Sequence, residues 1–222
     1  MAAPGQAQVV VARFSDEQIR RYSRQILLRE VGGHGQARLL AARPVLLCAG
    51  AVGEVAADYL WRAGVTELTL LAPTLALAAQ LSERLCASGY PGQPAQALPQ
   101  FSSASDARAL AEEAPGFSLL WLAGEAAAEP AALLWAGCDG AVGWVGQGRA
   151  ALRSILGSRP VARAASAGAM VVGSALALVA LQRLAGLPGP PGDTPARPDA
   201  IWRFDLDSPT LPQWRDARDP TG

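Results

Sequence analysis

The first strong pattern in the chain is an amphipathic helix that begins at a capping sequence. In FSDEQIRRYSRQILL, Ser15 precedes Gln18 by three residues, the spacing at which the two side chains cap a helix start. A helix is therefore predicted over residues 16–28, with Tyr22 and Ile26 on its apolar face. The breakers in GGHG end this helix, and GQARLLAARP predicts a second, short one.

Continuous and periodic apolar runs alternate after these helices. VLLCAG, residues 45–50, is uninterrupted and apolar, as in a strand buried on both faces. EVAADYLWRAG has helical spacing and stops at Gly64, and VTELTLLAP predicts a second strand, which completes a βαβ unit. The economical architecture is an α/β fold with a doubly wound, mostly parallel sheet, Rossmann-like, with helices on both faces.

The same alternation continues through the rest of the chain. Helices are predicted over residues 74–86, 106–114, 129–137 and 169–184, and strands over residues 117–124 and 140–146. RAALRSIL is interpreted as the start of an antiparallel segment. Five prolines in residues 186–200 prevent regular structure there, and IWRFDLDSPTLPQW predicts a final strand pair that packs its tryptophans on the domain.

One domain over residues 1–222 accounts for this organisation. A chain of this length, half of it hydrophobic, can bury one sizeable core. Its expected parts are N-terminal helices over residues 14–43, a Rossmann-like core over residues 44–185, a proline-rich linker over residues 186–200, and C-terminal strands and a tail over residues 201–222.

Composition narrows the expected partners and location. The 19 basic and 19 acidic residues cancel, so no large field would draw in nucleic acid or an anionic membrane. The uncharged run over residues 164–181 reaches the length of a membrane span, but its alanine, glycine and serine content favours a buried helix. The first residues carry no signal-peptide pattern. Three widely spaced cysteines and one histidine favour neither zinc nor disulfides, and a reducing cytoplasm is expected.

Several segments, in the same order and spacing, resemble the ThiF/MoeB/HesA family, bacterial relatives of ubiquitin-activating enzymes. They are RYSRQILL, GQARL, AGAVGEVAADYLWRAGVTELTLL, VVGSALALVALQRLAG and IWRFDLD. The resemblance implies a doubly wound domain that binds ATP and Mg²⁺ and adenylates the C-terminal glycine of a ubiquitin-like or sulfur-carrier protein. The paired cysteines that hold zinc in many members have no counterpart here.

The residues that such a site needs are only partly present. In the turn CAGAVG, Gly50 and Gly53 match the family, whereas Cys48 stands in place of the first glycine and Ala51 replaces another. Ala72 stands where an acid would bind the ribose hydroxyls.

The groups that would neutralise the triphosphate are also depleted. The following helix offers Gln80 and Arg84 in place of the family's asparagine and arginine, and Ala95 replaces its lysine. The chain has no lysine or asparagine at any position, and only Glu125 lies near the expected magnesium ligand.

The opening segment, by contrast, keeps the family pattern. In dimeric members the arginine of the RY-x-RQ motif, Arg24 here, reaches the ATP bound by the other subunit. The resemblance therefore predicts a degenerate member: a non-catalytic partner subunit that supplies Arg24 to a paralogous or identical chain. Residues 16–30 and the helix over residues 169–184 are expected in that dimer interface.

Other interpretations remain open on the sequence alone. The arginines of residues 20–29 could form only a solvated helix face. A working adenylyltransferase could use Arg84 for the lysine and Glu125 for the magnesium ligand, and CAGAVG is also compatible with a nicotinamide-dependent oxidoreductase. His34 is expected to have no catalytic duty. Cys48 and Cys138 are expected to be buried, and Cys86 is the one candidate thiol nucleophile.

Overall fold

A computed structural model of the chain describes most of the predicted elements. The residues described are 14–48, 50–72, 74–88, 96–98, 113–114, 116–122, 133–157, 166–187, 200–207 and 213–216. The helices are α1 (Asp16–Ile26), α2 (Gly32–Ala41), α3 (Ala51–Arg62), α4 (Leu75–Ser88), α6 (Arg149–Leu156) and α7 (Ser166–Ala185). The strands are β1 (Val45–Leu47), β2 (Thr69–Leu71), β3 (Gln96–Leu98), β4 (Ser118–Trp121), β5 (Leu133–Asp139), β6 (Val142–Gln147), β7 (Ala200–Asp205) and β8 (Gln213–Asp216).

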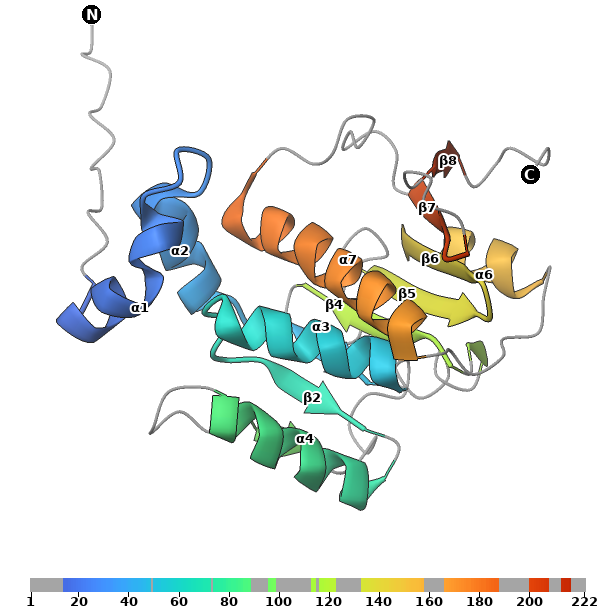
Figure 1. Ribbon diagram of the computed structural model, residues 1–222, viewed down its shortest axis with the longest axis horizontal. Coiled ribbons are helices and arrows are strands. Elements are labelled where there is room, and N and C mark those ends of the chain that lie inside the picture. Colours follow the sequence, from blue (N-terminus) through green and yellow to red (C-terminus); the bar gives the residue numbers. More distant parts are fainter. Residues whose placement is uncertain are drawn as a thin grey trace, which may run out of the picture.

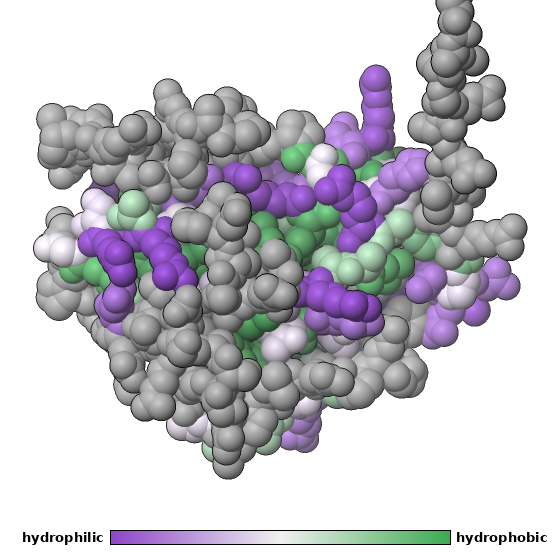
Figure 2. All heavy atoms as spheres, turned by 180° about the vertical axis from the view of Figure 1, so that it is seen from behind, coloured by the Kyte–Doolittle hydropathy of each residue, from purple (hydrophilic) through white to green (hydrophobic). Residues whose placement is uncertain are grey.

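The strands form one eight-stranded sheet in the order β3-β2-β1-β4-β5-β6-β7-β8. Helices α3 and α7 lie side by side across one face, with α4 beside α3 and β3 and with α1 and α2 at one end of the sheet (Figure 1). Helix α6 contributes Ala151 and Leu152 to a second apolar cluster with Trp135 and Phe117. Figure 2, seen from behind, shows apolar side chains in the middle of that view between charged ones. The predicted α/β class is thus confirmed.

The prediction of a mostly parallel sheet is wrong. Strands β1, β2 and β3 are parallel, but the five remaining neighbouring pairs are antiparallel. The reason is local for β5 and β6, because Asp139 pairs with Val142 across a two-residue turn in which Gly140 has φ +53°. A turn this short permits only antiparallel pairing.

Two predicted elements have the wrong type. The helix expected over residues 129–137 is replaced, where the structure describes it, by strand β5, whose alanine and leucine content had suggested a helix. RAALRSIL, expected to start an antiparallel segment, is helix α6. Strand β3 was not predicted, and the helix expected over residues 106–114 lies almost entirely outside the described residues.

The prediction of a C-terminal strand pair is confirmed. Strands β7 and β8 pair antiparallel with Trp202 opposite Trp214, and Trp202 is 8% exposed within the main core. The side chain of Trp214 and most of the linker over residues 186–200 lie outside the described residues.

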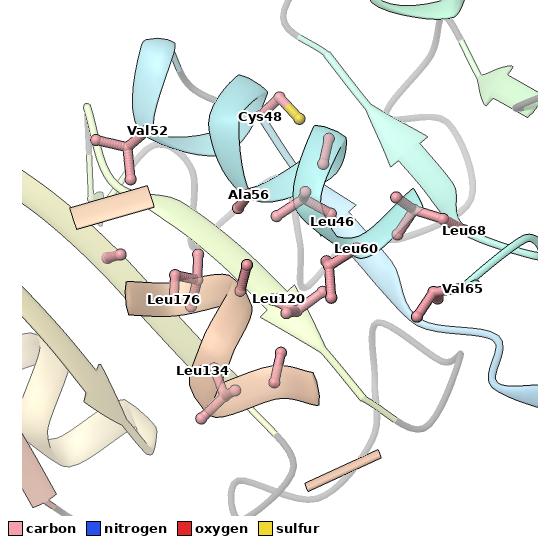
Figure 3. Packing of buried hydrophobic residues seen from close by; sticks show 14 of the residues in the cluster. Leu46, Cys48, Val52, Ala56, Leu60, Val65, Leu68, Leu120, Leu134 and Leu176 are labelled. Carbon is pink, nitrogen blue, oxygen red and sulfur yellow. The ribbon is translucent and has the colours of Figure 1, made fainter. Parts of the chain in front are cut away.

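The main core lies between the sheet and helices α3 and α7. Figure 3 shows Leu46, Leu120 and Leu134 of the sheet pointing toward Leu60 of α3 and Leu176 of α7. Helix α7 is long and apolar enough to cross a membrane by composition. Its inner side chains are nevertheless fully buried against the domain, as expected for a core helix.

The N-terminal helices pack on the C-terminal end of α3. The predicted capping box is present at α1. The Gln18 backbone N–H donates to the Ser15 Oγ at 3.1 Å, and the Ser15 backbone N–H donates to the Gln18 Oε1 at 2.9 Å. In α2 the buried Gln36 donates from Nε2 to the Ala63 carbonyl at 3.0 Å. This contact ties the first two helices to the end of α3.

Candidate functional site

The candidate site is the turn between β1 and α3, where the strand order reverses between β1 and β4. Open α/β sheets bind ligands at such a switch point. Gly50 is the N-cap of α3, and no atom lies within 4 Å of an ideal Cβ built on it, so the backbone there is open. Gly53 is different, because a Cβ there would lie 2.6 Å from the Ser118 Oγ and 2.8 Å from the Cys48 Cα. The close packing of α3 on the sheet therefore accounts for Gly53 without a ligand.

Ser118 is a site residue that sequence reasoning missed. Strand β4 runs antiparallel to β1, with Leu119 opposite Leu47. Ser118, the first residue of β4, therefore lies beside the end of β1, where the turn to α3 begins. The Ser118 side chain is completely buried, and its Oγ has no hydrogen-bond partner among the described residues. No sequence signal could have found it while a parallel β4 was assumed.

Arg84 reaches the turn but is already paired. Its guanidinium lies 3.0 Å from the Glu54 Oε2, with the two side chains 51% and 25% exposed. Glu54 stands in the first turn of α3, four residues after Gly50. Glu54 was also missed, although an acidic residue so close to a glycine turn is a visible signal. The structure thus gathers Gly50, Gly53 and Arg84 around one turn.

Arg24 lies elsewhere on the molecule. It is exposed in the last turn of α1, and Tyr22, two residues earlier, is buried against the C-terminal end of α3. A Cβ on Gly64, just beyond that end, would lie 3.2 Å from the Tyr22 ring. Since α3 has 12 residues, its two ends are about 18 Å apart. Arg24 is therefore separated from the turn of its own chain by the length of α3.

Comparison with known proteins matches the segment that contains both Arg24 and the β1–α3 turn. The ThiF family model matches residues 22–71, from Tyr22 in α1 to the end of β2. Over this segment the chain is similar to the ThiF family. This confirms the resemblance on which the candidate residues were chosen.

Matches to curated relatives cover a similar segment. The chain is 48% identical over 60 residues to the adenylyltransferase and sulfurtransferase MOCS3 of Bos taurus, which is 27% of this chain and 13% of that protein. It is 48% identical over 54 residues to the SAMP-activating enzyme E1 of Haloferax volcanii, 24% of this chain and 20% of that protein. It is 38% identical over 85 residues to the molybdopterin-synthase adenylyltransferase of Escherichia coli, 38% of this chain and 34% of that protein.

The fold extends further than the sequence similarity. A crystal structure of PaaA, in its selenomethionine form, superposes with a TM-score of 0.60 over 96% of this chain and 77% of that chain, at 16% identity. The identity is low enough that the match shows the fold alone. The curated relatives named above are covered over about a third of their length at most.

The residues at this turn do not fit a nucleoside triphosphate. Ala72, at the end of β2, is 2% exposed and offers no oxygen to a ribose. Gly53 is closed off by Ser118, and Glu54 adds a carboxylate to the first turn of α3, the helix end that would favour phosphate. Ala95 and Glu125, the positions expected for lysine and for a magnesium ligand, lie outside the described residues. Within the part of the chain that is described, no group of three or more histidine, cysteine or acidic side chains is placed to hold a metal ion.

The other candidate groups are scattered. His34 is exposed on α2 and Gln80 is exposed on α4. Cys48 is fully buried under the turn, and its burial, followed by the nearby Glu54 charge, raises the pKa of its thiol from 9.0 to about 12. Burial, followed by Asp139, raises the pKa of the Cys138 thiol to about 11. Thiolate forms of these two groups are negligible near neutral pH, as expected for buried structural cysteines.

We expect the three thiols to react in two classes. Cys86 is exposed, so Ellman's reagent at pH 8 should titrate one thiol quickly in the folded protein and the other two only after unfolding. Above pH 9 the unfolded chain loses thiol protons that Cys48 and Cys138 retain until about pH 12 and 11, so the free energy of unfolding should fall as pH rises in that window. Cys48→Ala should flatten this fall. Rapid labelling of all three thiols in the folded protein would contradict the assignment.

Proposed function

We propose that this ThiF-family chain is a non-catalytic subunit of an adenylating enzyme that acts on a ubiquitin-like or sulfur-carrier protein. In this proposal a second, paralogous chain binds ATP, and this chain supplies Arg24 across the interface. The main support is the pairing of Arg84 with Glu54, which leaves the turn without a free cation from α4. The relatives named above are adenylyltransferases or an activating enzyme, which supports the class of substrate.

The position of Arg24 supports donation to another chain. Arg24 is exposed on α1, which the buried Tyr22 anchors and which packs on α2, the helix held by Gln36, so its guanidinium can contact a docked partner. Because α3 separates Arg24 from the turn of its own chain, its natural target is a site on a second chain.

Exposed apolar side chains supply a surface for that partner. On α1 and just after it, Ile19, Leu27 and Leu28 are 47%, 82% and 52% exposed. On α7, Met170 and Leu178 are 60% and 57% exposed. A contiguous exposed apolar patch is typical of a subunit interface, and we propose that these side chains contribute to one. We include this dimer, with a paralogue or a second copy, and a cytoplasmic location in the proposal.

Pyrophosphate exchange tests the proposal. The purified chain, with ATP, Mg²⁺, labelled pyrophosphate and a carrier protein whose C-terminal carboxylate accepts the adenylyl group, is expected to give no exchange above background. Addition of a ThiF-family chain with a complete site should give exchange. Exchange by the isolated chain at a comparable rate would overturn the proposal.

That result would instead favour a working adenylyltransferase with a rebuilt site, for which the open backbone at Gly50 is the supporting observation. A nicotinamide-dependent oxidoreductase has less support, because Ala72 offers no ribose ligand and His34 lies on α2 rather than at the turn. Tight binding of NADH or NADPH in a titration would revive that alternative.

A further inference from the structure

The ion pair between Glu54 and Arg84 lies at the first turn of α3, next to the β1–α3 turn at Gly50. We propose that Glu54 is a specificity-determining residue that excludes polyanions, including pyrophosphate and nucleoside triphosphates, from the β1–α3 turn. The inference rests on the proposed function, since it explains physically why this chain would leave nucleotide binding to a partner.

The first step of the argument is the charge at the helix start. The first turn of α3 presents backbone amides, and the helix dipole makes this end favourable for negative charge. Glu54 lies in that first turn, so the chain's own carboxylate already provides the charge. A polyanion approaching Gly50 would meet this carboxylate at close range.

The second step is the loss of the cation that could hold the polyanion. Arg84 comes from α4, thirty residues further along the chain, and its guanidinium lies 3.0 Å from the Glu54 Oε2. The pair is neutral as a whole, so Arg84 attracts phosphate less strongly than an unpaired guanidinium would. The sequence contains no lysine that could replace it.

The third step is the shape of the turn below the ion pair. The buried Ser118 Oγ lies directly beneath Gly53, so the backbone there cannot move toward the sheet to make room for phosphate. The anion would have to bind from the open side at Gly50, four residues before Glu54. Removal of one negative charge is therefore the change that should matter most.

The test uses the full-length chain and inorganic pyrophosphate without metal, with binding measured by calorimetry and by thermal shift. The wild-type chain should show no saturable binding at millimolar pyrophosphate. Glu54→Gln removes the charge and keeps the side-chain shape, and its affinity should exceed that of the wild type by about tenfold or more, with the gain reduced by added salt. Glu54→Ser, which also suits the start of a helix, serves if Glu54→Gln folds poorly.

Two further variants make the result specific. Glu67→Gln removes a carboxylate from the exposed pair with Arg43, at 3.3 Å, and should gain nothing. The double variant Glu54→Gln with Arg84→Ala should lose the gain, because the released guanidinium is then absent. The inference is overturned if the wild type binds pyrophosphate as tightly as Glu54→Gln, if Glu67→Gln gains as much, or if the double variant keeps the gain.

These outcomes separate this inference from the proposed function. Failure of Glu54→Gln to bind would remove the role of Glu54 and leave the proposed subunit role intact. Pyrophosphate exchange by the wild-type chain alone would remove the subunit role whatever the variants do.

Discussion

Arg24→Ala is expected to lower the adenylation rate of the reconstituted pair by roughly ten- to a thousandfold, the scale on which one charge-stabilising donor contributes to a transition state. The fold of this chain should change little, because Arg24 is exposed and has no ion pair among the described residues. The rate is measured as pyrophosphate exchange with saturating partner and carrier protein. Circular dichroism and a denaturation midpoint check the fold.

Two arginines of the same segment are matched controls for Arg24→Ala. Arg20 is exposed on α1 and its Nε donates to the Asp16 carbonyl of its own helix, and Arg29 is exposed just beyond α1. Arg20→Ala and Arg29→Ala should each change the rate much less than Arg24→Ala. Equal effects of all three would mean that the arginines act only as a solvated helix face, and the donation of Arg24 would then be abandoned.

The local patterns in the sequence predicted the local structure well. The capping box at Ser15 and Gln18, the strand that begins at Val45 and the helix that stops before Gly64 all depend on residues within a few positions of one another, although the strand predicted over residues 45–50 ends at Leu47. The physical cause of each pattern is local, so the structure that it predicts does not depend on how the rest of the chain folds.

Long-range pairings were the part that the sequence did not reveal. The apolar run of β5 fits a buried helix or a buried strand equally well, and the turn at Asp139 and Gly140 was the signal that should have decided for a hairpin. The antiparallel position of β4 has no comparable local signal, and it is what brings Ser118 under Gly53.

The candidate site likewise contains residues that the sequence could identify and one contact that it could not. Gly50, Gly53 and Arg84 were found by resemblance, and the structure does place them around one turn. Glu54 alters the interpretation of this site because it pairs with Arg84. The two side chains meet only because α3 and α4 follow neighbouring strands of the sheet. A contact across thirty residues depends on the fold, so it could not be derived from spacing in the sequence.

The close contact of α3 with α7 gives the largest expected effect on stability. Gly173 lies in α7 where a Cβ would be 2.5 Å from the Val52 carbonyl oxygen and 2.8 Å from the Val55 Cβ. A backbone carbonyl cannot rotate away as a side-chain tip can, so the added methyl must push the helices apart. Gly173→Ala should lower the free energy of unfolding by about 2 kcal/mol, even though alanine favours helix by about 1 kcal/mol over glycine.

The sign of this change distinguishes packing from helix propensity. Gly33 lies in helix α2, where a Cβ would meet only a Phe14 ring carbon at 3.5 Å, an ordinary contact. Gly33→Ala should therefore raise the free energy of unfolding, by about 0.5 to 1 kcal/mol. Urea denaturation of both variants against the parent chain measures the two differences. Because Val52 and Val55 begin α3, Gly173→Ala should also disturb the turn at Gly50, and stabilisation by both substitutions would mean that α7 does not pack on α3 as closely as the structure places it.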